Sequence, residues 1–360
     1  MMNVMRGLRF CARQFLKQWG LSEQFQIWGL AMEIREQLQK YTIKDDRIGA
    51  VSYFATFVVY FGALYLAITN VAHWGVLIPC MIVNAFAAVR LYVLQHDCGH
   101  ASLFKSRKAN DLAGEVLSVL TFAPYAVMRF NHNEHHSHLG NLEHRETGEI
   151  HTMTLREWND AGVWARLQYR LYRNPFILIP VGSLFTYFIR YRWPKKAVDV
   201  GAGAVLLHNL AIFGYMAVIW ALAGWTGVLI WFLSSFIGGM IGVFMVYLQH
   251  NFEDTYWDRK PDLNPRVAAL QGSSALDLGW WMDLGSANIA YHDIHHFNAR
   301  IPHYNLRKCH QAIRDEYDLR VIKWPEALRS FSLKLWDEDQ MRLVPFPKAG
   351  RTDTAVTPAQ

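Results

Sequence analysis

Eight of the sixteen histidines fall into three short clusters with helical spacing. The clusters are QHDCGH at 95–100, HNEHH at 132–136 and HDIHH at 292–296. Residues three and four positions apart lie on one face of an α-helix, so each cluster can direct its imidazoles toward one point. Neutral imidazole is a ligand for iron, zinc and copper. The spacing predicts a site for two metals whose ligands are His96, His100, His132, His135, His136, His292, His295 and His296.

The simpler interpretation, that these are ordinary surface histidines, does not account for the clustering. Surface histidines would scatter along the chain, and a metal-buffering tract would be contiguous and of low complexity. The four cysteines have no Cys-x-x-Cys spacing, so they predict neither a disulfide framework nor an iron–sulfur cluster.

Acidic residues accompany the clusters. Asp97, Glu134 and Asp293 lie within or beside them. Metal-bound imidazoles usually donate their other N–H to a carboxylate or a carbonyl. The three acids are therefore candidates for that supporting role, although the sequence leaves open that they point outward.

The composition favours a membrane protein. Of the 360 residues, 52% are hydrophobic and 14% aromatic, including fourteen Trp. Aromatic residues are enriched where membrane proteins meet the interface. The net charge of +6 is compatible with an anionic membrane face or with nucleic acid. The chain has no zinc-finger, helix-turn-helix or ribonucleoprotein pattern, so we expect no nucleic-acid partner.

Four segments are apolar enough to cross a bilayer, which needs about 20 residues in helical form. They predict an all-α integral membrane protein whose four transmembrane helices form two hairpins, under a helical cap that carries the histidine site. The predicted spans are 51–69, 74–94, 198–223 and 226–248.

Charge predicts the orientation of these spans. The two short links contain no Lys or Arg, whereas the long loop is rich in both. The positive-inside rule then places both termini and all three clusters on the cytoplasmic side. We expect an interfacial segment at 1–48, a membrane domain at 49–345 with cytoplasmic parts 95–197 and 249–345, and a disordered tail at 346–360.

Several features adjoin the predicted membrane domain. Two mixed apolar stretches, 112–127 and 175–189, suit helices that lie in the interface. His250, at the cytoplasmic end of the fourth span, is a ninth candidate ligand. A supporting or surface role is expected for His138, His144, His151, His303 and His310. His73 and His208 are excluded, being on the wrong side or within a span.

A histidine-rich metal site that is reached from the membrane suggests chemistry on a substrate that is dissolved in the membrane. Unactivated C–H bonds resist acids, bases and nucleophiles, so breaking them calls for a redox metal such as iron. Zinc-dependent hydrolysis would need fewer ligands and a general base.

In these clusters the chain resembles the membrane-bound fatty acid desaturases of the acyl-lipid type. The resemblance runs from about Leu94 to Cys309 and includes HDCGHASLF at His96, HNEHHSHLGNLEHRETGEIHTMT at His132, QHNFEDTYW at Gln249, LQGSS at Leu270 and HDIHHFNARIPHYNLRKCH at His292. The three histidine clusters correspond to the histidine boxes of this family. The first box has three residues between its histidines, as in acyl-lipid desaturases, and the third box begins with His292 rather than with Gln. Ala287 and Ala290 stand where many relatives have glycine, which leaves the local helix packing in question.

The resemblance implies an enzyme with two non-haem iron ions that uses dioxygen and two external electrons to introduce a cis double bond into a membrane lipid-linked acyl chain. It implies that the box histidines hold the irons, that His250 matches a further family histidine, and that Asn288 assists through a hydrogen bond or a water. Because no His-Pro-Gly-Gly haem motif is present, electrons would come from a separate donor, a ferredoxin or a cytochrome b5-like protein with its reductase.

Two alternatives remain open at this point. A related di-iron membrane hydroxylase or ketolase, acting on an alkane or a carotenoid, shares the architecture and the first hydrogen abstraction. A membrane metal-binding or transport protein would need ligands along a path through the spans, whereas these clusters are predicted at one face.

Overall fold

The computed structural model describes residues 33–145, 150–193, 200–260, 262–317 and 319–347. Most of the predicted segment 1–48 and nearly all of the predicted tail 346–360 lie outside these ranges. The described residues form, in chain order, η1 (Gln39–Thr42), α3 (Asp46–Thr69), α4 (Trp74–Gly99), α5 (Arg107–Thr121), α6 (Tyr125–Ser137), α7 (Leu155–Asp160), α8 (Val163–Tyr172), α9 (Pro175–Ser183), η2 (Leu184–Ile189), η3 (Arg190–Arg192), α11 (Ala202–His250), α12 (Pro265–Gln271), β1 (Ala275–Asp277), α13 (Trp280–Gly285), α14 (His292–Phe297), α15 (His303–Tyr317), β2 (Val321–Lys323), α16 (Trp324–Ser330), β3 (Leu335–Asp337) and β4 (Arg342–Val344).

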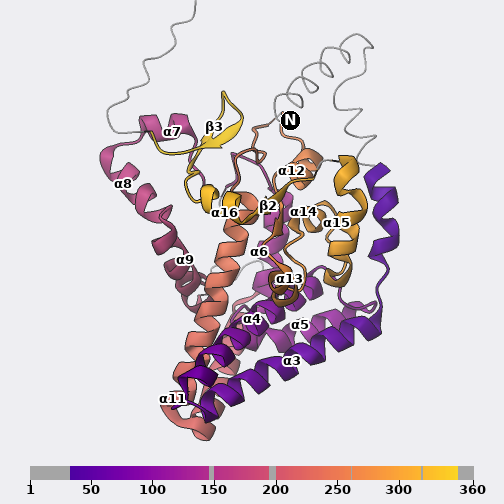
Figure 1. Ribbon diagram of the computed structural model, residues 1–360, viewed down its shortest axis with the longest axis vertical. Helices are drawn as coiled ribbons and strands as arrows, with labels where there is room; N and C mark the ends of the chain where they lie inside the picture. Colours follow the sequence, from indigo (N-terminus) through magenta and orange to yellow (C-terminus); the bar gives the residue numbers. More distant parts are fainter. Residues whose placement is uncertain (1–32, 146–149, 194–199, 261, 318, 348–360) are drawn as a thin grey trace, which may run out of the picture.

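Three of the described helices, α3, α4 and α11, are long and apolar enough to cross a membrane. They occupy one end of the molecule, and the shorter elements gather at the other (Figure 1). Their outer faces expose large apolar side chains, such as Val58 (72% exposed) and Leu207 (70% exposed). A water-soluble chain would bury such faces, so their natural surroundings are lipid.

The first predicted hairpin is present as α3 and α4. The α3 helix begins at Asp45, whose carboxylate accepts hydrogen bonds from the backbone N–H groups of Arg47 and Ile48. The α4 helix continues five residues beyond the predicted end of its span, to Gly99. The first histidine cluster therefore lies on the last turn of a long helix rather than in a following loop.

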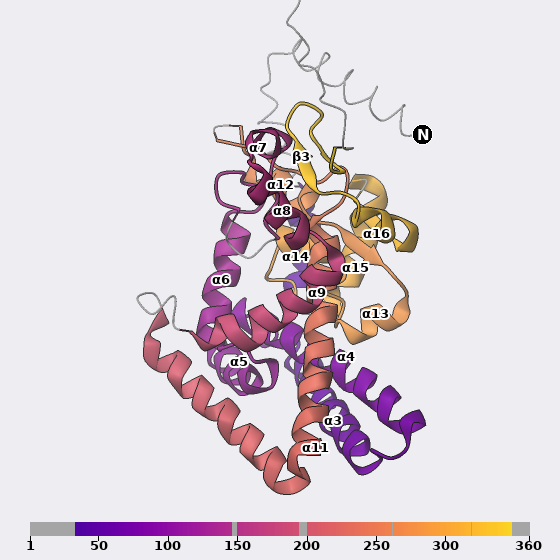
Figure 2. The ribbon, with the colours of Figure 1, turned by 90° about the vertical axis from the view of Figure 1, so that its left-hand side faces the viewer.

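The two remaining predicted spans form one element, α11, which is broken at Gly224. Gly224 has φ +61° and ψ −166°, a conformation open essentially to glycine alone. In Figure 2 the chain descends along one limb of α11, turns, and ascends along the other. The ascending limb ends at His250, close to the upper elements.

The predicted interfacial stretch 112–127 is divided between two helices. The chain leaves α5 at Phe122, which has the left-handed φ of +59°, and enters α6 after Pro124. The two helices are bent by 98° and would count as a fourth candidate span only if taken together. The stretch 175–189 forms α9 and the π-helix η2.

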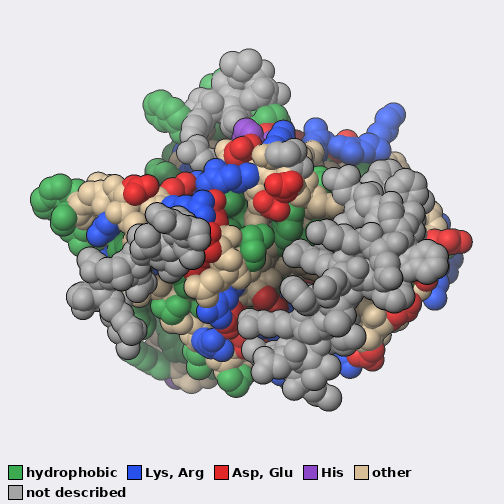
Figure 3. All heavy atoms as spheres, turned by 90° about the horizontal axis from the view of Figure 1, so that it is seen from above, with side chains coloured by type: hydrophobic (Ala, Val, Ile, Leu, Met, Phe, Trp, Pro, Cys, Tyr) green, Lys and Arg blue, Asp and Glu red, His purple; other side chains and the backbone are tan. Residues whose placement is uncertain are grey.

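The upper end carries two small sheets, which correct the all-helical prediction. Strands β1 and β2 pair in parallel, with Leu276 opposite Ile322, and β3 and β4 pair antiparallel, with Trp336 opposite Leu343. Seen from above, this end carries charged side chains of both signs (Figure 3). It differs in this respect from the apolar exterior of the long helices.

Candidate functional site: two groups of buried histidines

Nine histidines from four helices gather where the long helices meet the upper elements. They come from the end of α4 and the residue after it, from α6, from the last residue of α11, and from α14 (Figure 1). In each of two groups, one ring nitrogen per histidine lies within 4.8 Å of the corresponding nitrogen of every other member. The first group is His96, His100, His132, His136 and His295; the second is His135, His250, His292 and His296. These nine are the eight box histidines and the additional candidate of the sequence analysis.

In the first group the Nε2 atoms converge. Nε2 of His132 lies 2.7 Å from Nε2 of His96 and 2.8 Å from Nε2 of His136, which is 2.9 Å from Nε2 of His295. Ligand nitrogens around one ion, with metal–nitrogen bonds of about 2.1 Å, are separated by roughly 3 Å. The spacing of these nitrogens fits a shared metal ion.

The second group is arranged in the same way. Nε2 of His296 lies 2.9 Å from Nε2 of His292 and 3.2 Å from Nε2 of His135. His250 completes the group from α11. Its Nδ1 donates to the carbonyl oxygen of Gly272 at 3.0 Å, and its buried Nε2 has no hydrogen-bond partner. A buried, unpartnered nitrogen is costly in the folded protein unless a ligand engages it.

Burial sets the charge of these rings. Desolvation, followed by the influence of neighbouring imidazoles, holds the pKa values of His292, His295 and His296 well below the ordinary histidine value. The rings are therefore neutral at pH 7 and retain a lone pair for a metal. Neutral nitrogen donors in this number fit a redox-active metal such as iron better than the hard, oxygen-preferring cations.

Two of the acidic residues that were predicted to support the ligands, Asp97 and Asp293, are buried and directly follow a member of each histidine group in sequence. Asp97 is 1% exposed, and its Oδ2 accepts from the backbone N–H of His303 at 2.8 Å and from Nδ1 of the same residue at 2.9 Å. Asp293 is fully buried, and its Oδ2 accepts from Nδ1 of His310 at 2.8 Å. These specific Asp–His pairs were not predicted from the sequence.

The other two predicted supporting residues are placed differently. The carboxylate of Glu134 is 42% exposed and lies 4.0 Å from Nδ1 of His138, and it belongs to neither histidine group. The side-chain amide of Asn288 donates to the carbonyl oxygen of His303 at 3.3 Å. Asn288 and the preceding Ala287 both have left-handed φ values, of +59° and +48°. Glycine would adopt this conformation at position 287 with less strain than alanine.

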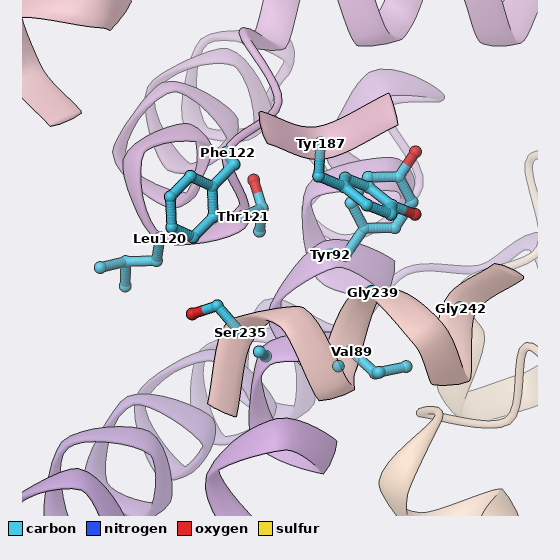
Figure 4. A pocket seen from close by; sticks show the side chains of 11 residues that line it. Val89, Tyr92, Leu120, Thr121, Phe122, Tyr187, Ser235, Gly239 and Gly242 are labelled. Carbon is cyan, nitrogen blue, oxygen red and sulfur yellow. The ribbon is translucent and has the colours of Figure 1, made fainter. Parts of the chain in front are cut away.

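A small apolar pocket of about 40 Å³ lies between α4, the end of α5, η2 and α11. From α4 it is lined by Val89 and Tyr92, which precede His96 by two helical turns and one. Tyr187 covers it from η2, and Gly239 and Gly242 provide the floor from α11 (Figure 4). The pocket thus adjoins the helices that carry ligand candidates of both groups.

Fold and site together define a class of protein: a helical chain with long apolar helices and two histidine groups, one buried and one buried in part, that are suited to metal ions. Comparison with known proteins identifies the family. Residues 72–326 match the Fatty acid desaturase family, and this range contains all nine histidines. The chain belongs to the fatty acid desaturase family and is an oxidoreductase.

Curated relatives agree with this assignment. A Fatty acid desaturase of Bacillus subtilis (strain 168) is 31% identical over 87% of this chain and 90% of its own length. An sn-1 oleoyl-lipid 12-desaturase of Anabaena variabilis is 25% identical over 79% of this chain and 82% of its own. An sn-1 acyl-lipid omega-3 desaturase (ferredoxin) of Nostoc sp. (strain 36) is 26% identical over 73% of this chain and 74% of its own length.

Proposed function

We propose that the chain is a di-iron acyl-lipid desaturase in which the nine histidines hold two non-haem irons. The observation that carries the proposal is the division of these histidines into groups of five and four, with ligand atoms within 4.8 Å of one another. The irons, when bound, supply the oxidising power needed to break unactivated C–H bonds with dioxygen. The net reaction converts one –CH2–CH2– unit, one dioxygen, two electrons and two protons into –CH=CH– and two waters.

The residues of the chain contribute positioning and exclusion of water. The apolar pocket beside Tyr92 and Gly239 would hold part of the acyl chain near the histidines, because both adjoin the same stretches of α4 and α11. Of the eight box histidines, His135, His292, His295 and His296 are at most 8% exposed, which limits the access of bulk water to this part of the site.

The substrate and the electron donor are inferred from the relatives. The printed names of the Anabaena and Nostoc proteins specify lipid-linked acyl chains, and the second of them also specifies ferredoxin. We infer a lipid-linked acyl substrate and a separate ferredoxin-like donor for this chain. A cytochrome b5-like donor with its reductase is the alternative, which reconstitution with each donor would distinguish.

The membrane arrangement is part of the proposal. Counting the two limbs of α11 separately gives four crossings, and the break at Gly224 supports this count because it lets the chain reverse. From four crossings and the positive charge of the long loop we infer that both histidine groups lie at the cytoplasmic face, with both termini on the same side.

Replacement of ligand histidines tests the function. His295→Ala in the first group and His135→Ala in the second should each abolish the unsaturated product and lower the iron content of the purified protein. The exposed His73, in the α3–α4 link, provides the matched control, since His73→Ala should leave both unchanged. Mass spectrometry of the acyl chains should show a loss of two mass units, whereas a gain of sixteen would indicate a hydroxylase.

Unchanged unsaturation in both ligand variants would refute the ligand assignment. Retained iron without oxygen consumption in the wild-type protein would instead support the metal-binding alternative.

A further inference from the structure

Helix α15 carries two buried histidines that are not in either metal group. His303 and His310 are seven residues apart, so they lie on one face of the helix, and each is 1% exposed. Each bonds through Nδ1 to a carboxylate that directly follows the first histidine of a box: Asp97 after His96, and Asp293 after His292. One helix thus reaches the back of both metal groups.

At Asp97 the two carboxylate oxygens have different surroundings. Oδ2 accepts both hydrogen bonds from His303. Oδ1 is buried without a hydrogen-bond partner and lies 3.6 Å from Nδ1 of His96, which is itself buried and unpartnered. The facing pair consists of one donor and one acceptor, and a shift of about half an ångström would bring it into hydrogen-bonding range.

The expected role of Nε2 of His96 explains why its Nδ1 needs a hydrogen-bond acceptor. Nε2 of His96 faces the first group, 2.7 Å from Nε2 of His132. To bind a metal, Nε2 must be unprotonated, so the proton of the neutral ring is on Nδ1. Oδ1 of Asp97, 3.6 Å away, is the nearby acceptor for that N–H, and a hydrogen bond between them would select the tautomer and fix the ring orientation.

The support continues beyond His303 with consistent hydrogen-bond directions. Because Nδ1 of a neutral His303 donates to Asp97, its Nε2 accepts, and the hydroxyl of Ser52 lies 2.9 Å away to donate. The same hydroxyl oxygen accepts from Nη2 of Arg90 at 3.0 Å. With this tautomer, both ring nitrogens of His303 and the hydroxyl of Ser52 have partners.

We propose that His303 is a positioning residue for metal binding, which acts through Asp97 on His96 and the first histidine group. The inference rests on the proposed function, since it assumes that this group binds iron. His310 and Asp293 form the corresponding pair behind the second group, but Nε2 of His310 has no hydrogen-bond partner.

Two substitutions of His303 separate positioning from simple packing. Asn places an amide N–H near the position of Nδ1 and preserves the donor to Asp97, although it is smaller than His. Leu fills more of the space but removes the donor. The backbone N–H of His303 continues to donate to Asp97 in both variants.

The measurement is iron uptake and release by the full-length protein in detergent. Metal-free protein is loaded with ferrous iron under anaerobic conditions, and the loss of iron to a competing chelator is followed. The wild type should hold two irons per chain. In His303→Leu, release of one of the two should accelerate about 10- to 100-fold, whereas His303→Asn should stay near the wild-type rate.

Three other outcomes of the iron measurement would contradict the inference. Release from His303→Leu at the wild-type rate, or faster release from His303→Asn than from His303→Leu, would overturn the inference while leaving the proposed function intact. Wild-type protein that takes up no iron would overturn both. If His303→Leu does not fold, Ser52→Ala replaces it. This variant removes the donor to Nε2 of His303 and the acceptor of Arg90 but keeps His303 and its bond to Asp97, and a wild-type release rate there counts against the inference.

Discussion

Glu157 illustrates how one charged side chain stabilises the upper end of the molecule. Its carboxylate accepts from both terminal nitrogens of Arg145, at 2.5 and 2.7 Å, and from the backbone N–H of Thr154 at 2.7 Å. The hydrogen bonds from Arg145, opposed by partial burial, lower the pKa of Glu157 to about 2. The ionised form is therefore favoured more strongly in the folded than in the unfolded protein.

The depressed pKa of Glu157 determines how its contribution to folding stability changes with pH. Because the folded-state pKa is depressed below the ordinary value of 4.5, the stabilisation is complete above pH 4.5 and is lost as the pH falls toward about 2. Glu157→Gln should lower the melting temperature at pH 7 by a few degrees, about 1 kcal/mol after allowance for solvent screening. This difference should shrink between pH 4.5 and pH 3, as measured by thermal unfolding in detergent.

The exposed Glu143 provides the control, since Glu143→Gln should not change the melting temperature. A wild-type–Glu157→Gln difference that stays constant from pH 7 to pH 3 would contradict the assigned cause.

At the residue level, clustering made the ligand candidates predictable. Helical spacing marks residues that share one face, so the eight clustered histidines could be proposed as ligands without knowledge of the fold. His250 was a candidate because of its position at the end of the fourth predicted span. Asp97 could be suspected because it is adjacent to His96. Its partner His303 is more than two hundred residues away in sequence, and only tertiary packing brings the pair together. A visible signal was the two histidines of α15 at a spacing of seven.

Among the helices, the contact between α4 and α11 determines how ligand candidates from different segments meet. The ascending limb of α11 contains Gly238, where the two helices pack closely. A Cβ atom there would lie 2.9 Å from the carbonyl oxygen of Ala85 on α4. A backbone oxygen inside a helix cannot move aside, so any added methyl would push the helices apart.

Gly238→Ala should therefore destabilise the protein by about 1–3 kcal/mol, the usual cost of overpacking. It should also accelerate iron release, because α4 carries His96 and α11 carries His250. Gly242→Ala is the matched control: its Cβ would meet only the hydroxyl end of Tyr187, at 3.3 Å. Equal melting temperatures for the two variants would show that α4 and α11 tolerate separation.

Helices could be predicted from the sequence where their apolar composition alone identifies them. Runs of apolar residues identified α3, α4 and both limbs of α11, because a span must satisfy its backbone within itself and bury few charges. Helices and strands of the upper end were largely missed. Short elements such as β1 and β2 are stabilised by pairing between distant segments, which leaves little trace in local periodicity.

For the whole molecule, the proposed topology makes a direct prediction about sidedness. In a chain with Cys11→Ser and Cys80→Ser, the remaining Cys98 and Cys309 are buried, and one accessible cysteine at a time can be introduced at Val71, at Trp225 or at Lys108. Val71 and Trp225 adjoin the two turns of the long helices and are 44% and 70% exposed. Their cysteine variants should react with a membrane-impermeant maleimide from outside intact cells, whereas Lys108→Cys should react only after permeabilisation.

Labelling of Lys108→Cys in intact cells would reverse or break the proposed orientation. Labelling of Val71→Cys but not Trp225→Cys would show that the two limbs of α11 do not both cross the membrane.

The distribution of the histidines along the chain has a consequence for biosynthesis. Both groups draw members from α14, the first through His295 and the second through His292 and His296, and their earliest members are His96 and His135. Neither group can be complete until the ribosome has passed position 296, long after the apolar helices have emerged. If the groups hold iron as proposed, loading is a maturation step that follows insertion, and a nascent protein arrested before α14 would accumulate without metal.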